Sequence, residues 1–323
     1  MTTTAVETYL SADDVRAALR ADVVRGLTSS PKELPPKWFY DERGSQLFDE
    51  ITRLPEYYPT RREREILAAR AGEIAHASGA GVLVELGAGT AEKTRSILDA
   101  MRDLRSLERY VPFDVSEQTL RDTADAIAQE YPGIDVHGVV GDFDRHLGRI
   151  PVGGRRMVAF LGGTIGNFPP MTRRTFLAEI AAALRPGDSF LLGTDLVKDV
   201  TRLEAAYNDS QGVTAAFNLN VLTVINRELE ADFDLEGFEH VARFDSENEW
   251  IEMLLRSKVD QTVHVSAIGL KAEFAAGEEM RTEVSAKFRR PFVEAELSDA
   301  GLEVAHWWTD DHGDFALSLS FPR

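Results

Sequence analysis

The chain has no cysteine among its 323 residues. Disulfide-stapled scaffolds, thiolate zinc sites and cysteine nucleophiles are therefore excluded. The seven histidines show no metal-ligand spacing, so we expect no metal cofactor and assign none of them to catalysis: His76, His137, His146, His240, His264, His306 and His312.

Long apolar runs are also missing. No stretch of eighteen consecutive apolar residues occurs, so we expect no membrane-spanning helix. Residues 1–10 contain no basic segment followed by an apolar one, which predicts no secretory signal and a cytoplasmic location.

Positive charge is scarce. The chain carries 36 Lys and Arg against 54 Asp and Glu, a net charge of −18, which repels phosphate backbones and acidic membrane surfaces. The short arginine clusters are typical of solvated faces, so we expect neither nucleic acid nor membrane as a partner. Residues 228–252 hold ten of the acids against the single base Arg243, and this block predicts an exposed face.

A glycine turn follows the apolar run Val-Leu-Val-Glu-Leu at residues 82–86. Gly87 and Gly89 allow a tight turn, and residues 90–101 predict a helix whose free N–H groups favour an anionic group. Glu92 stands where a dinucleotide fingerprint has its third glycine, and no P-loop sequence occurs. The Glu-x-Gly-x-Gly form resembles motif I of class I S-adenosylmethionine-dependent methyltransferases, although a purely structural turn has the same pattern.

Further predicted strands also end in polar or aromatic groups. Asp114 ends the strand at 109–114, where it suits either ribose hydroxyls or a helix N-cap. Asp142 and Phe143 follow the strand at 135–140 and suit the adenine amine and ring, while core packing is the other reading of Phe143. The repeated strand–helix–strand order predicts an α/β fold with a parallel sheet.

The predicted organisation has two domains. Residues 61–197 and 287–323 form a Rossmann-like cofactor domain whose seven-stranded, mostly parallel sheet ends in an antiparallel closing strand. Residues 1–60 and 198–286 form a smaller α+β substrate domain, with helices over 199–226 and antiparallel strands near 252–274, and the substrate is expected in a cleft between the domains. Thr60-Arg-Arg-Glu63 predicts a capping box for a helix reaching about residue 77.

Four separated strings carry a more specific resemblance: PPKWFYDERGS at 35–45, ITRLPEYYPTR at 51–61, GTIGNF at 163–168 and GEEMRTEVS at 277–285. Together they resemble the actinobacterial histidine Nα-methyltransferases of ergothioneine biosynthesis, over nearly the whole chain. The resemblance implies a monomeric, metal-independent class I methyltransferase. Its implied reaction uses three S-adenosylmethionine molecules to convert L-histidine to hercynine.

The same resemblance implies the site residues. Cofactor contacts fall on Gly87, Lys93, Asp114, Asp142 and Phe143. The substrate carboxylate falls to Asn167 and Tyr207, and the imidazole to Tyr57, Glu283 and Ser285. Tyr40 lies near the amine, which Tyr40 and Asn167 position for catalysis without a covalent nucleophile, while Thr214 and Met253 line the pocket.

These residue types fit methyl transfer, in which positioning does most of the work. Uncharged grips on the carboxylate avoid a cation beside the amine, where an ammonium develops, and a Glu283 carboxylate accepts an imidazole N–H. Each residue also has a structural reading: Tyr57 and Tyr207 as core tyrosines, Asn167 as a helix cap, Glu283 and Ser285 as outward strand positions. The alternative functions are methylation of another amino acid such as tryptophan, a silent S-adenosylmethionine-binding protein, and an NAD-linked oxidoreductase.

Overall fold

The computed structural model describes residues 4–323, apart from the side chain of Asp144. Contacts divide the chain into two compact units, one of residues 4–11, 61–196 and 288–323 and the other of residues 12–60 and 197–287. The predicted boundaries put residues 1–60 in the second unit, whereas residues 4–11 contact the first.

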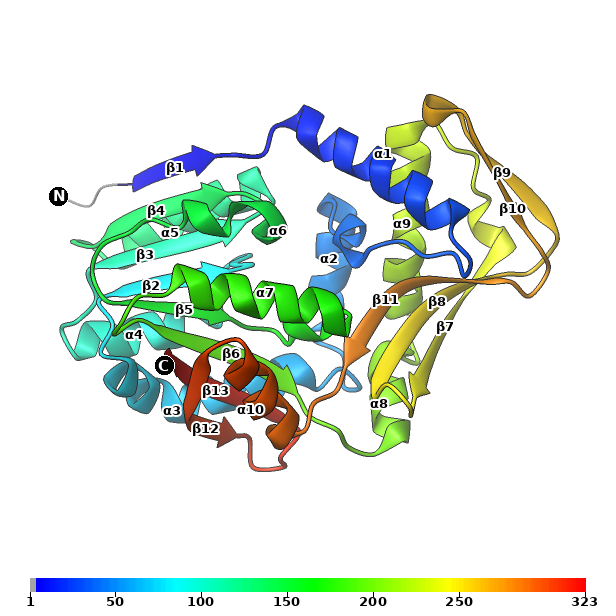
Figure 1. The fold of residues 1–323 in the computed structure, drawn as a ribbon. Coiled ribbons are helices and arrows are strands. Elements are labelled where there is room, and N and C mark those ends of the chain that lie inside the picture. The colour runs from blue at the N-terminus through cyan, green and yellow to red at the C-terminus, as the bar shows by residue number, and fades with distance from the viewer. Residues whose placement is uncertain (1–3) are drawn as a thin grey trace. The chain divides into compact units, whose positions relative to one another are not determined.

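An eight-stranded sheet forms the centre of the first unit, in the order β1-β4-β3-β2-β5-β6-β13-β12 (Figure 1). β13 runs antiparallel to both of its neighbours, and every other pair is parallel, which confirms the predicted parallel sheet with its antiparallel closing strand. The strands are β1 (Thr4–Thr8), β2 (Val82–Leu86), β3 (Arg109–Asp114), β4 (Asp135–Val140), β5 (Arg156–Phe160), β6 (Ser189–Asp195), β12 (Leu302–Thr309) and β13 (Phe315–Pro322).

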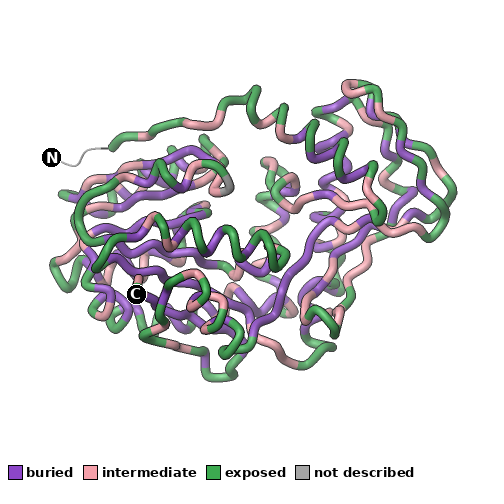
Figure 2. Tube along the Cα trace, viewed as in Figure 1, coloured by how far each residue is buried: buried purple, intermediate pink, exposed green. Residues whose placement is uncertain are grey.

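The predicted count of seven strands is wrong by β1, which pairs in parallel with the edge of β4. Its five residues are mostly exposed, so the segment has no buried apolar face that a sequence pattern reveals. The remaining seven strands are those expected, and all five residues of β2 are buried (Figure 2).

Helices cover both faces of this sheet. The apolar residues of α3, α4 and α5 share one cluster with Leu83 and Tyr110, while phenylalanines near α6 and α7 pack on Phe160. The helices are α3 (Pro59–Ser78), α4 (Arg95–Asp103), α5 (Glu117–Glu130), α6 (Phe143–His146), α7 (Pro170–Ala183) and α10 (Arg290–Asp299), with 3-10 turns at η2 (Leu147–Arg149) and η3 (Thr164–Asn167).

Two helix starts differ from expectation. α4 begins at Arg95 rather than near Thr90, because Gly87, Gly89 and Ala91 have φ angles of 71°, 48° and 52° and extend the turn. α3 confirms the predicted helix, but it begins at Pro59, and Glu63 contacts distant groups instead of closing a capping box.

The second unit combines helices with two small antiparallel sheets, of order β11-β8-β7 and β10-β9. Its helices are α1 (Ala12–Thr28), α2 (Glu42–Ile51), α8 (Val200–Tyr207) and α9 (Val213–Leu229), with 3-10 turns η1 (Pro36–Phe39), η4 (Leu235–Gly237) and η5 (Ser266–Ile268). Its strands are β7 (Phe238–Asp245), β8 (Trp250–Ser257), β9 (Gln261–Val265), β10 (Leu270–Phe274) and β11 (Glu279–Ala286). The helices expected at 199–226 and the antiparallel strands are thus confirmed.

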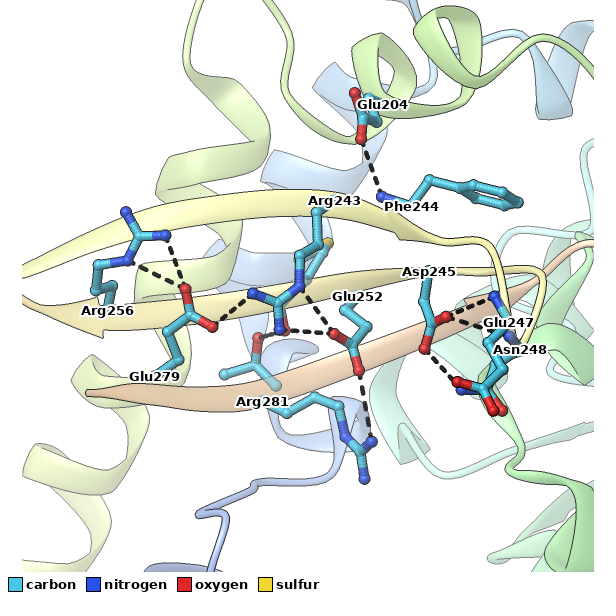
Figure 3. A network of polar contacts seen from close by, with 12 residues as sticks. Glu204, Arg243, Phe244, Asp245, Glu247, Asn248, Glu252, Arg256, Glu279 and Arg281 are labelled. Carbon is cyan, nitrogen blue, oxygen red and sulfur yellow. Dashed lines mark hydrogen bonds and ion pairs between the residues drawn. The ribbon is translucent and has the colours of Figure 1, made fainter. Parts of the chain in front are cut away.

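Alternating charges line part of the β7-β8-β11 sheet (Figure 3). Arg243 pairs with Glu252 at 3.0 Å and with Glu279 at 2.7 Å, and Arg256 also reaches Glu279 at 2.7 Å. Part of the acidic block therefore forms a half-exposed ladder of ion pairs. None of the helices in the described part of the chain combines the length and apolar character needed to span a membrane.

Candidate functional site

The predicted site residues fall into two groups, one in each unit. Gly87, Lys93, Asp114, Asp142, Phe143 and Asn167 belong to the first unit. Tyr40, Tyr57, Tyr207, Thr214, Met253, Glu283 and Ser285 belong to the second.

The glycine turn is open toward solvent. A Cβ atom added at Gly87 or Gly89 meets no atom within 4 Å. Glycine is needed here because the backbone φ angles are left-handed, and the space beside the turn is open. Asp114 at the tip of β3 holds this turn, since its carboxylate accepts from Gly89 N at 2.9 Å and from Ser116 N at 3.0 Å. Burial raises the pKa of Asp114, while these N–H groups act in the opposite direction.

A helix cap does not account for Asp114, and core packing does not fully account for Phe143. Ser116, not Asp114, is the N-cap of α5. Phe143 contacts Phe113 and Phe160 with ring centroids 6.0 and 5.7 Å apart, yet it is only half-buried, and Asp142 beside it is also partly exposed. A ring packed on one side and partly open on the other has a face available for a planar ligand.

Behind the turn lies a buried group of charged side chains. Glu85 on β2 accepts hydrogen bonds from Thr94 and from the Tyr110 hydroxyl, the latter at 2.5 Å. Burial raises the pKa of Glu85 to about 7 against the effect of those bonds and of Lys93. Lys93 forms an ion pair with Glu63, and it donates to no other described residue, so two ammonium hydrogens stay available for a ligand.

Asn167 ends η3 and does not cap α7, whose N-cap is Pro169. Its amide group has no hydrogen-bond partner among residues 4–323 and is half-buried, which leaves it free to hold a ligand. The loop before it turns on Gly162 and Gly163, whose φ angles are 79° and 69°.

In the second unit, Tyr207 and Ser285 are brought together with a lysine that the sequence analysis missed. The Tyr207 hydroxyl and Ser285 Oγ are 2.7 Å apart, and Lys287 Nζ donates to both, at 3.0 and 2.8 Å. The ammonium also lies 4.6 Å from the centre of the Tyr207 ring. The uncharged pair expected at the carboxylate, Asn167 and Tyr207, stays a prediction, and the structure adds an ammonium that donates to one of the two. The alternation that pairs Glu283 with Ser285 on β11 continues to residue 287 and could have found Lys287.

Glu283 is a buried acid on the same strand, with 9% of its surface exposed. Burial raises its pKa to about 7, and Lys287 acts in the opposite direction. No described residue donates a hydrogen bond to its carboxylate. Its partner across the β8–β11 pair is the buried Met253, so these two predicted pocket residues are neighbours.

The aromatic residues of the second unit form a continuous wall. The Tyr57 ring meets Tyr207 edge-on at 6.2 Å, and the Tyr40 ring meets Phe217 at 5.4 Å. The pKa of Tyr40 is raised by burial and by the nearby Glu283 and Tyr207. Tyr40 keeps 40% of its surface exposed. Thr214 is buried one turn before Phe217 on α9.

A second missed residue, His240, supports this wall. Burial lowers its pKa, and its ring lies between Tyr207 O and Asn218 Nδ2, at 2.8 Å from each. The carbonyl fixes the hydrogen on Nε2, so Nδ1 accepts from Asn218. Asn218 Oδ1 in turn accepts from Thr282 at 2.6 Å, which ties Tyr207 to the strand that carries Glu283.

No group of three or more potential metal ligands occurs in the described part of the chain. The first unit offers a polar turn for an anionic or nucleoside-like ligand. The second offers a buried acid, an ammonium and several hydroxyls beside a cluster of aromatic rings.

The sequence is similar to those of several known proteins. The sequence profile of a family described as "Histidine-specific methyltransferase, SAM-dependent" matches residues 19–321. The chain is 61% identical to the histidine N-alpha-methyltransferase of Mycolicibacterium smegmatis, over 98% of this chain and 99% of that protein. The Mycobacterium tuberculosis protein of the same name is 59% identical, over 98% of each chain. Ergothioneine biosynthesis protein 1 of Neurospora crassa is 32% identical, over 90% of this chain and 33% of that protein.

Proposed function

Since this chain belongs to the family of S-adenosylmethionine-dependent, histidine-specific methyltransferases, we propose that it trimethylates the α-amino group of L-histidine to hercynine. The observation that carries the substrate assignment is the buried carboxyl of Glu283, which has no hydrogen-bond partner in the described chain and lies on β11 with Ser285, just before Lys287. The full-length similarity to two histidine N-alpha-methyltransferases supports the same assignment. The name of the Neurospora relative favours ergothioneine biosynthesis as the pathway.

S-adenosylmethionine supplies a sulfonium whose methyl group is open to in-line attack. Gly87 and Lys93 would hold its methionine part, the Lys93 ammonium facing the carboxylate. Asp114 would accept from the ribose hydroxyls with the lone pairs that the two backbone N–H groups leave open. Asp142 and Phe143 would contact the adenine amine and ring.

Histidine would be held at both ends. Asn167 and Tyr207 would bind the carboxylate, and Lys287 would strengthen the Tyr207 hydroxyl as a donor by donating to its oxygen. Tyr57, Glu283 and Ser285 would bind the imidazole, with Thr214 and Met253 beside them. A buried acid with a pKa of about 7 can either accept an imidazole N–H or share a proton with the ring.

The amine must present a lone pair to the methyl group at each round. Tyr40, with Asn167, would orient it, and its hydroxyl is a neutral hydrogen-bonding partner at pH 7, since a pKa raised above the ordinary 10.0 leaves it protonated. Aromatic rings also attract the methylated ammonium formed in earlier rounds. Positioning of this kind needs no covalent nucleophile. The absence of a metal requirement, the monomeric state and the cytoplasmic location stay predictions.

A mass-spectrometric assay tests the proposal. The chain is incubated with S-adenosylmethionine and each of the twenty amino acids, and we expect three successive methyl additions to histidine alone. Three methyl additions to tryptophan instead would show that tryptophan, and not histidine, is the substrate. No addition to any of them would indicate a silent binding protein.

A further inference from the structure

Glu63 is a buried charge that the proposed reaction does not use. It lies near the start of α3, after the first turn, with 0% of its surface exposed. Its Oε2 atom pairs with Lys93 Nζ, and its Oε1 atom accepts from Gly162 N at 2.7 Å. The carboxylate thus joins two segments that are 30 and 99 residues away in sequence.

Only a carboxylate satisfies both neighbours. Lys93 Nζ and Gly162 N are donors, so the side chain between them must supply two acceptor atoms. An amide of the same shape has one acceptor oxygen, and its NH₂ group faces a second donor. Gly193 on β6 leaves space for the Glu63 carboxylate, because a Cβ atom added at Gly193 would lie 2.5 Å from Glu63 Oε1.

One of the two segments belongs to the proposed cofactor site and the other to the proposed substrate site. Lys93 follows the glycine turn of the cofactor. Gly162 begins the left-handed turn through Gly163 that leads into η3 and ends at Asn167. By contrast, the acid Glu85 accepts hydrogen bonds from Thr94 and Tyr110 and, among residues 4–323, from no residue of this loop.

We infer that Glu63 is a positioning residue that sets Lys93 for the cofactor carboxylate and the 162–167 loop for the substrate carboxylate at the same time. This inference rests on the proposed function, because that function gives Lys93 and Asn167 their ligands. Loss of the charge therefore weakens the binding of both ligands.

The test compares Glu63→Gln with Glu65→Gln, a control on the same helix whose side chain is about half exposed. Calorimetry gives the Kd of S-adenosylhomocysteine, and initial rates at saturating cofactor give KM for histidine. For Glu63→Gln we expect both constants to rise about 10- to 100-fold, the range of one charged hydrogen bond. A rise in the cofactor Kd alone, or no rise in either, overturns the inference.

Gly193→Ala provides an independent arm if Glu63→Gln does not fold. Its methyl group displaces Oε1, the atom that holds Gly162, so KM for histidine should rise more than the cofactor Kd. Gly72→Ala is the matched control, since a Cβ atom there meets nothing within 4 Å. Unchanged constants in Gly193→Ala, or a larger change for the cofactor, contradict the inference. A wild-type chain that binds S-adenosylhomocysteine but never methylates histidine refutes the proposed function instead.

Discussion

Glu85 and Glu283 are two buried acids with the same raised pKa, about 7, in different units of the chain. Each carboxylate oxygen of Glu85 accepts one hydrogen bond within the fold, from Thr94 and from Tyr110. Glu283 has no such donor among the described residues, and only the charge of Lys287 favours its ionised form. The shifted pKa therefore does not distinguish the two acids, whereas the lack of a donor to Glu283 does.

The largest expected difference between the two acids concerns stability. A folded pKa of about 7 against an ordinary value of 4.5 means that the ionised form opposes folding. The contribution of such an acid to stability is present below about pH 4.5 and is lost as the pH rises through 7. At pH 8, Glu283→Gln should raise the free energy of unfolding of the ligand-free protein, by on the order of 3 kcal/mol, and this gap should narrow toward pH 5.

Urea unfolding of both variants at pH 5 and pH 8 measures this effect. Glu85→Gln is the matched variant, and its gain should be smaller, because an amide keeps one acceptor oxygen and one of the two hydroxyls loses its acceptor. Equal stabilisation by both substitutions would show that the two acids are alike.

The next effect is on binding. Glu283→Ala should weaken histidine about 10- to 100-fold in calorimetry at saturating S-adenosylhomocysteine, because one charged hydrogen bond to the imidazole is lost. Glu85→Gln should leave histidine affinity within about twofold, since its hydrogen bonds join β2 to β3 and to the start of α4. An unchanged affinity in Glu283→Ala removes the imidazole contact from the proposal.

Sequence patterns predict most of the fold because its strands are local, apolar runs. β2 is buried throughout, and seven strands of the large sheet follow from such runs and their turns. The sequence pattern does not predict β1, because this strand is held by backbone hydrogen bonds to β4. The paired residues Thr4 and Val136 are 132 residues apart. The start of α4 is misplaced because Ala91 takes a left-handed conformation that few non-glycine residues adopt.

The site is predicted less completely because its supporting residues act through tertiary contacts. Glu63 resembles a helix cap in sequence, yet its partners Lys93 and Gly162 come from other segments. Lys287 and His240 each support Tyr207, one at the hydroxyl and the other at the carbonyl. No local pattern links either residue to Tyr207, which lies 80 residues from Lys287 and 33 from His240.

Lys287→Met should raise KM for histidine about tenfold, because Tyr207 and Ser285 lose the charged donor that orders them. Initial rates at saturating cofactor measure it. Lys258→Met is the control, an exposed lysine whose Nζ donates only to Glu236 O. If the cofactor Kd changes and the KM for histidine does not, Lys287 does not support substrate binding.

The smallest expected effect is at His240. His240→Gln should raise KM for histidine about 2- to 10-fold, the range of one neutral hydrogen bond, with kcat less affected. The control is His264→Gln, an exposed histidine beside Asp232. If both histidine variants have wild-type KM, the bond to Tyr207 O contributes nothing to substrate placement.

In the proposed site Glu283, unlike Glu85, has no donor within the described fold and keeps its carboxylate for the substrate imidazole. A crystal structure of the chain with S-adenosylhomocysteine and L-histidine bound tests it most directly. We predict an imidazole nitrogen within hydrogen-bond distance of the Glu283 carboxylate and the substrate carboxylate at Tyr207. Histidine bound in the opposite orientation, with its imidazole away from Glu283, would contradict the account.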